Sequence, residues 1–461
     1  RRQRQMCIRD RNKNYSTYLA LCGRLSAKLS SLFSEGGVDV IDPKPNQQKN
    51  NTAQMIERIL WTVAIATMLF SLLFDTPIGI AQGVWKIILH PDGLITDYSK
   101  VGGFGATFFN SGLIMSASII IIKKSHATIS GPTIACVFLM AGFSMFGKNI
   151  ANIWPIILGV YLFSRHQKEN FSKYVYIALY GTALSPLITV VALESGNLVQ
   201  KLLAVILCGT LIGFLLPPLA TYCLRVHQGY NLYNVGFAAG LVGTLIVSVM
   251  KSFGYETTSS LIWTYENDPR VIAYIFLLSA SLMAGGWFML DDKKSIRRIY
   301  RHSGRLVADF IILDGLPITL FNMGSLGIFA SAYILITGGT INGATMGGIL
   351  TIIGFGAFGK HLRNVVPVIG GVYLGSLVKV WNIYDPSVQL AALFGTALAP
   401  ISGQFGWQYG VLVGFLHSSM ALNTGILHGG LNLYNNGFSA GILALIIVPV
   451  IETFKKRKDH F

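Results

Sequence analysis

The sequence contains little charge. Only 12% of its 461 residues are charged, which is about half the share found in an ordinary soluble domain. Hydrophobic residues make up 52%, and they recur in runs close to the ~20 residues that cross a bilayer as a helix. This composition excludes a cytosolic enzyme, a secreted disulfide scaffold and a disordered chain. It predicts a membrane protein with many crossings.

Cysteine and enzyme signatures are scarce as well. The five cysteines show no paired spacing, and three of them lie in apolar runs, where cysteine acts as a small hydrophobic residue. We find no HExxH, Walker-type, GxSxG or dinucleotide-binding motif. We therefore expect no disulfide, no metal site, no cofactor, no catalytic residue and no enzymatic activity. The cysteines are Cys7, Cys22, Cys136, Cys208 and Cys223.

Positive charge is abundant, with a formal net charge of +16, but its placement is that of a membrane protein. The basic residues lie in short loops and at both ends of the chain, as the positive-inside rule requires. A nucleic-acid partner would need a soluble basic domain, and the sequence has none. We expect a multi-pass protein of the bacterial plasma (inner) membrane with both termini in the cytoplasm.

Five parts follow along the chain. We expect a basic cytoplasmic tail over 1–57, a membrane repeat over 58–253, an external loop over 254–270, a second repeat over 271–451 and a basic tail over 452–461. Residues 1–11 resemble translated sequencing adapter and are left out of the fold prediction. Between Tyr15 and Leu32, apolar residues at helical spacing predict an amphipathic helix, either on the membrane surface or packed on the protein.

The chain repeats itself. His90–Ser164 aligns without a gap onto His302–Ser376, so that TISGPTIACVFLMAGFSMFGKN returns as TINGATMGGILTIIGFGAFGKH. Further on, YGTALSP matches FGTALAP, and HQGYNLYNVGFAAG matches HGGLNLYNNGFSAG. The sequence is therefore a tandem duplication.

Seven apolar runs fall in each half. The dense basic clusters all lie on one side when the N-terminal tail is placed inside. Because each half then has an odd number of crossings, the two copies are inverted relative to each other, as in many transporters. The predicted fold is an all-α polytopic membrane protein of two inverted-topology repeats. The runs are 58–75, 104–122, 128–146, 149–164, 174–193, 201–223 and 232–251, then 271–290, 313–337, 343–358, 363–378, 387–402, 407–425 and 432–451.

Glycine and proline recur at matched positions inside these runs. Such interruptions in both halves predict discontinuous helices that line a binding site, and some crossings are then re-entrant pairs. If both members of such a pair re-enter and do not cross, the number of crossings in that half stays odd. The matched positions are Pro155 with Pro367, Gly181 with Gly395, and Pro186 with Pro400.

Amide and tyrosine side chains that both copies retain are the candidate solute-binding residues, because a polar group in an apolar run is costly unless it is paired or hydrated. The alternatives are helix–helix hydrogen bonds for the first pair and helix capping for the NLYN groups. These residues are Asn110 with Asn322, Asn152 with Asn364, and Asn231, Tyr233 and Asn234 with Asn432, Tyr434 and Asn435.

Charged residues retained in both copies are candidates for gating or coupling. Lys148 and Lys360 either extend to the lipid headgroups or form a cationic ring that attracts anions. Asp97 and Asp309 precede spanning helices, and helix capping is the default expectation for them. His227 and His428 precede the NLYN groups, where a structural role is expected.

The duplicated pattern of LFNxG, GFxxFGK, NxxPxxxGVYL and NLYNxGFxAG resembles a bacterial membrane protein family classed as a domain of unknown function, over about Ile59 to Phe454. That label implies no activity. The NLYN groups and LPITLFN are also similar, more distantly, to motifs of urea transporters, although GATFFN in the first half departs from the Leu-Pro form. This second resemblance implies a small neutral solute.

The leading functional expectation is a channel or transporter for a small hydrophilic solute, neutral and amide-like, with its pathway between the repeats. An ion-coupled transporter of a small anion and a non-transporting scaffold or receptor remain as alternatives. The expected partners are the lipid bilayer and the solute, with a homo-oligomer as a further option.

Overall fold

The computed structural model describes residues 45–91, 93, 95–194, 196–255 and 261–458. The chain divides into two compact units, Arg1–Asn51 and Thr52–Phe461. Only the second unit is described below. The amphipathic helix expected before Leu32 lies outside the described residues, as does the end of the C-terminal tail.

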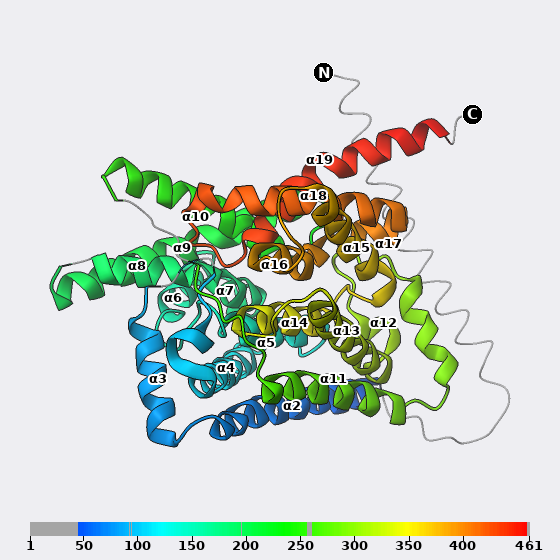
Figure 1. Cartoon of the computed structure of the whole chain (residues 1–461), viewed down its shortest axis with the longest axis horizontal. Coiled ribbons are helices and arrows are strands. Elements are labelled where there is room, and N and C mark those ends of the chain that lie inside the picture. Colours follow the sequence, from blue (N-terminus) through cyan, green and yellow to red (C-terminus); the bar gives the residue numbers. More distant parts are fainter. Residues whose placement is uncertain (1–44, 92, 94, 195, 256–260, 459–461) are drawn as a thin grey trace. The chain divides into compact units, whose positions relative to one another are not determined.

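The first half of the chain is a succession of helices (Figure 1). In chain order they are α2 (Pro45–Phe70), η1 (Ser71–Leu73), α3 (Pro77–Leu89), α4 (Tyr98–Lys124), α5 (Gly131–Phe143), α6 (Trp154–His166), η2 (Phe171–Lys173), α7 (Val175–Gly181), η3 (Thr182–Leu184), α8 (Ser185–Glu194), α9 (Leu198–Val226) and α10 (Asn234–Ser252).

The second half repeats the pattern. Its elements are α11 (Pro269–Phe288), η4 (Lys293–Arg301), α12 (Phe310–Asp314), α13 (Leu316–Ile336), α14 (Gly343–Phe355), α15 (Leu362–Val378), α16 (Pro386–Gly395), η5 (Thr396–Leu398), α17 (Ala399–Phe405), α18 (Trp407–Thr424), η6 (Gly425–His428) and α19 (Asn435–Lys458). No strand occurs within the described ranges, and the predicted all-α class is confirmed.

Ten of the described helical segments are long and apolar enough to cross a membrane, which makes this a multi-pass membrane protein. The other four predicted runs form the shorter helices α5, α6, α14 and α15, three of 13 residues and one of 17. A 13-residue helix extends only about 20 Å, less than the ~30 Å hydrocarbon core. The short helices form one consecutive pair in each half, so the odd parity of each repeat is unchanged. The helix α3 fell between the predicted runs and was not expected.

Matched glycines break the chain at the same place in both repeats. Gly103 interrupts α4 with φ 84°, and Gly315 separates α12 from α13 with φ 88°. Such positive φ values cost glycine little because it lacks a Cβ. The helix α4 is therefore the counterpart of α12 and α13 together.

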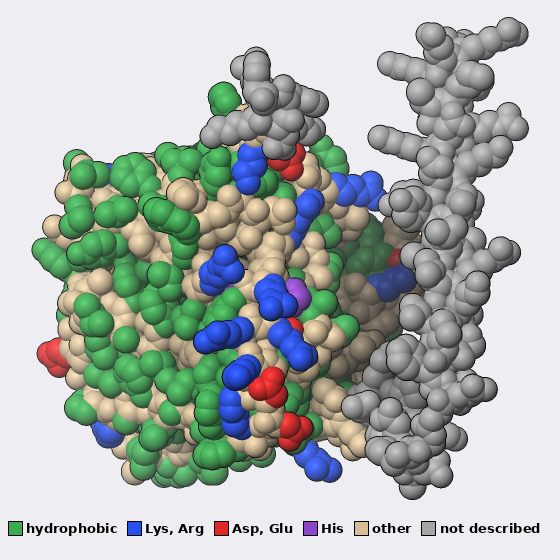
Figure 2. Space-filling view, turned by 90° about the vertical axis from the view of Figure 1, so that its right-hand side faces the viewer, with side chains coloured by type: hydrophobic (Ala, Val, Ile, Leu, Met, Phe, Trp, Pro, Cys, Tyr) green, Lys and Arg blue, Asp and Glu red, His purple; other side chains and the backbone are tan. Residues whose placement is uncertain are grey.

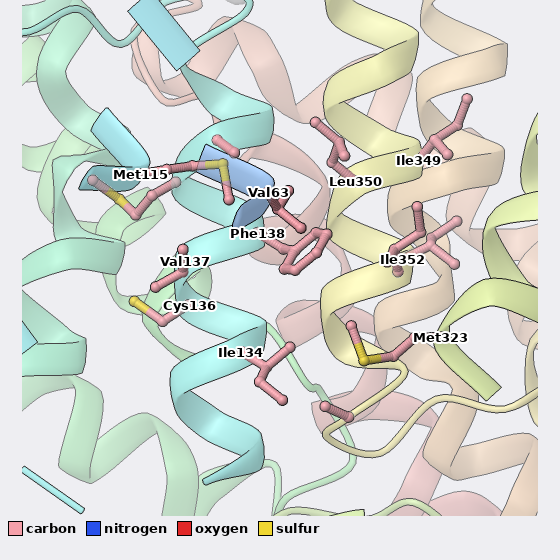
Figure 3. Packing of buried hydrophobic residues seen from close by; sticks show 14 of the residues in the cluster. Val63, Met115, Ile134, Cys136, Val137, Phe138, Met323, Ile349, Leu350 and Ile352 are labelled. Carbon is pink, nitrogen blue, oxygen red and sulfur yellow. The ribbon is translucent and has the colours of Figure 1, made fainter. Parts of the chain in front are cut away.

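The repeats meet where α5 crosses α14. A Cβ at Gly142 would lie 2.5 Å from the carbonyl oxygen of Gly347, and one at Gly354 would lie 2.6 Å from Phe138 Cβ. The end of each helix thus packs on the beginning of the other. Figure 3 shows apolar side chains of α5, among them Phe138, beside Leu350 and Ile352 of α14.

This antiparallel contact between equivalent helices supports the inverted arrangement. A two-fold axis that runs across a helix pair reverses one helix relative to the other, whereas parallel repeats would leave them aligned. Packing within each repeat also matches: Gly112 of α4 packs on Met68 of α2, and its counterpart Gly324 of α13 packs on Met283 of α11.

The helices α10 and α19 also begin beside each other. A Cβ at Gly236 would lie 2.8 Å from the Tyr434 ring, and one at Gly437 would lie 2.9 Å from Tyr233 Cβ. From this contact the two helices extend in opposite directions (Figure 1). The positive ends of two helix dipoles therefore meet between the repeats.

Side-chain chemistry divides the surface. On the face shown in Figure 2, lysine and arginine side chains gather together, and hydrophobic side chains cover the area beside them. Gathering of basic residues on one side is the pattern of the positive-inside rule.

Candidate functional site

The two matched asparagines hold the turns that follow the short central helices. The Asn110 amide nitrogen donates to the carbonyl oxygens of Ser144 (2.7 Å) and Lys148 (2.9 Å). The Asn322 amide nitrogen makes the equivalent bonds to Gly356 (2.8 Å) and Lys360 (2.7 Å). Both side-chain oxygens are buried without a partner. The amide donors of the two asparagines are therefore used within the fold, and only their acceptors remain free.

These turns carry two buried lysines. Lys148 and Lys360 each have 0% of their surface exposed, so the expected extension to the lipid headgroups is wrong for both. Each ammonium lies over the last aromatic residue of its preceding helix, 5.0 Å from the Phe143 centroid and 5.2 Å from the Phe355 centroid. Both lysines thus turn back into the protein.

Lys360 is well supplied with oxygen partners. Its ammonium donates to the Tyr233 hydroxyl at 2.6 Å and to the Thr396 hydroxyl at 2.7 Å. Tyr233 comes from the NLYN group of the other repeat, and Thr396 begins η5, the interruption between α16 and α17. This contact joins the two repeats at a broken helix.

Lys148 has a different environment. Its ammonium donates to the Met140 sulfur at 3.3 Å, and a thioether is only a weak acceptor. The Thr182 hydroxyl, the counterpart of Thr396, lies 3.6 Å from the same sulfur and donates to the Leu179 carbonyl. The methionine therefore separates Lys148 from its equivalent threonine.

Aromatic rings fill the space between the lysines. The Tyr233 and Tyr434 centroids are 5.2 Å apart, and Tyr434 packs edge-on against Phe143 at 4.6 Å. The Tyr180 hydroxyl is buried without a partner. We call this set the central cluster: Lys148, Lys360, Thr182, Thr396, Tyr180, Tyr233, Tyr434, Phe143 and Phe355.

Most other candidate asparagines shape turns. In NLYN, Asn231 accepts from the Tyr233 amide and donates to the Gly437 carbonyl of the other repeat, while Asn432 accepts from the Tyr434 amide. The backbone of each NLYN group is also bonded to the broken helix of the opposite repeat, Leu232 to Ala397 and Leu433 to Ala183, at 3.0 Å.

The last asparagine of each NLYN group pairs with the histidine before it. The His227 ring bonds the Asn234 side chain at 2.8 Å, and the His428 ring bonds Asn435 at 3.0 Å. The amide nitrogens of the two asparagines donate to carbonyl oxygens of the preceding helix. These contacts give the histidines the structural role that was expected.

Asn152 and Asn364 also close turns. They donate to the carbonyls of Gly147 and Gly359 at 3.2 and 2.9 Å, in the loops that carry the two lysines. Neither belongs to the central cluster.

The aspartates cap helices across the repeat boundary. Asp97 caps α4 and also accepts from the Gly343 amide, the first residue of α14. Asp309 caps α12 and accepts from Gly131, the first residue of α5. The expected capping role is confirmed for both, and each aspartate additionally stabilises the N-terminus of a short helix of the other repeat.

Three polar members of the central cluster, and its two phenylalanines, were not predicted from the sequence. Thr182 and Thr396 lie inside the quoted GTAL motifs, but only their glycine and proline neighbours were singled out. Tyr180 precedes the same motif and has Phe394 as its counterpart. A matched threonine directly after a matched glycine was the signal available.

A narrow cleft of about 70 Å³ lies next to the central cluster and is separated from it by aromatic rings. Two of its lining rings, Phe146 and Phe394, lie 5.3 and 5.5 Å from Phe143. The cleft is lined by Ile95, Phe146, Ser387, Leu390, Phe394, Ala421, Leu422, Gly425, Leu433, Asn435 and Asn436.

In the second repeat, the residues before α12 pack on the residues that precede the first NLYN group. The Leu306 amide donates to the Gly229 carbonyl at 3.0 Å, and the Arg305 guanidinium lies 4.5 Å from the Tyr230 ring centroid.

Two larger hollows lie on the outer surface. One of about 830 Å³ adjoins α4 and α6, and one of about 650 Å³ lies between α2 and α11. Their lining is mostly apolar and includes none of the matched polar or charged candidates, although Pro155 lines the first, so they suit contact with acyl chains.

Comparison with known proteins identifies a family but no activity. No curated protein matches the chain, and no solved structure does; the resemblance to urea transporters is therefore not shown. A protein-family model matches residues 76–252 and 291–453, one region in each repeat. The chain thus belongs to the family described as "Protein of unknown function (DUF1576)".

Proposed function

We propose that this protein is a membrane transporter or channel for a small hydrophilic solute, with the solute pathway through the central cluster between the inverted repeats. The observation that carries the proposal is the pair of buried lysines at interrupted helices, matched in both repeats. Polar groups at the meeting point of broken helices are the usual site of a solute in inverted-repeat transporters.

The contacts also bear on the alternative of a scaffold. A scaffold would use its polar residues for packing alone, and the aspartates and most asparagines do pack in this way. The central cluster adds a buried lysine whose hydrogen-bond acceptor among the described residues is a sulfur, and a Tyr180 hydroxyl without a partner among them. Buried groups of this kind are costly in a purely structural role.

Two solute classes remain within the proposal. The free acceptors of Asn110 and Asn322 suit the neutral, amide-like solute that the sequence favoured. The two lysines suit an anion. The proposal further places the protein in the bacterial plasma membrane with both termini in the cytoplasm, with the bilayer and the solute as its partners and no catalytic step.

Solute flux into proteoliposomes tests the proposal. Stopped-flow light scattering with urea, acetamide, glycerol and sodium salts of small organic anions, the salts also under imposed Na⁺ and pH gradients, is expected to show relaxation faster than in protein-free liposomes. Tyr233→Phe removes only the hydroxyl that binds Lys360, and we expect it to change the rate at least threefold. Tyr161→Phe, at a 43% exposed surface residue, is the matched control. No flux above the protein-free rate under any condition would refute transport of these solutes and favour the scaffold.

A further inference from the structure

The two equivalent lysines have different hydrogen-bond acceptors, and Lys148 has fewer of them than Lys360. An ammonium has three donors. Lys360 directs two of them to hydroxyl oxygens at 2.6 and 2.7 Å. Lys148 has a single thioether sulfur at 3.3 Å.

The oxygen groups that could accept hydrogen bonds from the Lys148 ammonium are present in the sequence, but they are not bonded to it. The counterparts of Tyr233 and Thr396 are Tyr434 and Thr182. Thr182 donates its single hydroxyl hydrogen to the Leu179 carbonyl at 2.6 Å, with the Met140 sulfur farther away at 3.6 Å, and the described contacts include no hydrogen bond from Lys148 to Tyr434. Lys360 shows how this fold satisfies the amine with its own oxygens, and at Lys148 that arrangement is missing.

No carboxylate compensates the charge. Among the described residues, the ion pairs involve Lys123, Lys173, Arg270 and His302, and neither buried lysine takes part. Lys148 is nevertheless 0% exposed. A buried ammonium without an anionic partner is strongly unfavourable.

The surroundings favour negative charge at this point. The N-termini of α10 and α19 meet at Tyr233 and Tyr434, and helix N-termini attract anions. Tyr434 packs on Phe143, the ring beneath the Lys148 ammonium. Two rings that line the cleft, Phe146 and Phe394, pack against the same Phe143 ring.

We infer that the solute is a small anion, that it enters from the cleft past Phe146 and Phe394, and that Lys148 binds it. The anion takes the place that hydroxyl oxygens occupy at Lys360. This inference rests on the proposed function and names its solute class.

Thermal unfolding of the full-length protein in detergent tests the inference. The probes are chloride, acetate, lactate and phosphate as sodium salts, with acetamide and lactamide as neutral isosteres and sodium gluconate to hold the ionic strength constant. A ligand that binds only the folded state raises the unfolding midpoint. We expect at least one small anion to raise it by several degrees, and the neutral isosteres to leave it unchanged.

Lys148→Met should abolish this rise, because it removes the charge at similar volume. Lys360→Met makes the same change at the equivalent position and should retain the rise. If Lys148→Met does not fold, Lys148→Gln is used instead. The unfolding midpoint of the wild-type protein with each anion and with its neutral isostere also tests whether an anion binds. The inference is overturned if no anion exceeds its isostere or gluconate, or if the Lys148 variant shows the full rise.

Flux measurements separate this result from the proposed function. If acetamide enters the proteoliposomes and no anion raises the unfolding midpoint, the proposed transport function is retained and the inference of an anionic solute is refuted. Anion binding at Lys148 without flux of any solute would support the site and count against transport.

Discussion

A single asparagine in an apolar helix can serve a solute or the fold, and the contacts of Asn110 and Asn322 separate the two uses. Both amide nitrogens bind backbone carbonyls of the lysine turn. These carbonyls cannot be satisfied by their own helix, because the chain leaves the helix there. The asparagines therefore position the lysines, while their oxygens stay available.

Replacement of Asn322 by leucine should lower stability. Asn322→Leu keeps the approximate size but leaves the carbonyls of Gly356 and Lys360 without donors, at a cost of about 2 kcal/mol. Asn423→Leu, at an exposed helical asparagine bonded only to the Ser419 carbonyl, is the matched control and should cost less than about 0.5 kcal/mol. Denaturation followed by circular dichroism measures both, and equal stabilities would contradict the positioning role.

The sequence could reveal which polar residues recur but not what they face. The FGK and NLYN motifs predicted Lys148, Lys360 and Tyr233, and the capping of Asp97 and Asp309 followed from their place before a helix. Contacts between the repeats could not be predicted, since a one-dimensional comparison shows equivalence and not adjacency. The bond from Asp97 to Gly343 joins residues far apart in the chain.

At the scale of helices, the crossing of α5 and α14 depends on small residues. The backbones approach closely at Gly142 and Gly347, as small residues permit in membrane helices. The apolar runs 128–146 and 343–358 predicted helices here, but such a run fits a full crossing and a short buried helix equally well. The structure decides between these two alternatives, because both helices end after 13 residues and are too short for a full crossing.

At this crossing, even the addition of one methyl group should lower the stability of the protein. The added Cβ of Gly142→Ala would lie 2.5 Å from the Gly347 carbonyl oxygen, so the helices must separate, and we expect a loss of about 1–3 kcal/mol. Gly370→Ala, inside α15 with nothing within 4 Å of the new Cβ, should gain about 0.5–1 kcal/mol from helix propensity. Unfolding midpoints of the two variants should move in opposite directions, and a neutral Gly142→Ala would argue against close packing.

For the whole molecule, two inverted copies of one sequence produce a centre that is not symmetric. Equivalent helices cross antiparallel at α5 and α14, yet Lys360 binds two hydroxyl oxygens while Lys148 binds a methionine sulfur. A sequence can predict the pseudo-symmetry, because both halves carry the same motifs. It cannot predict which half adopts which conformation, because this choice depends on contacts such as Lys360 with Tyr233 that only one side makes.

Inversion makes a definite prediction about sidedness. Between Lys124 and Phe253 lie the short pair α5–α6 and then three membrane segments, namely α7 with α8, α9, and α10. Whether the pair crosses or re-enters, the number of crossings is odd, so the two residues must lie on opposite sides. Single cysteines at each, in a cysteine-less background, can be labelled with a membrane-impermeant maleimide in intact cells.

Phe253→Cys, at a residue 78% exposed, should react from outside, and Lys124→Cys should react only after permeabilisation. Val380→Cys, at 96% exposure in the second repeat, should behave like Phe253→Cys, because α16 with α17, α18 and α19 then return the chain to the cytoplasmic side. Labelling of Lys124→Cys and Phe253→Cys from one side would mean an even number of crossings per repeat. The repeats would then be parallel, and the antiparallel contact of α5 with α14 would need another origin.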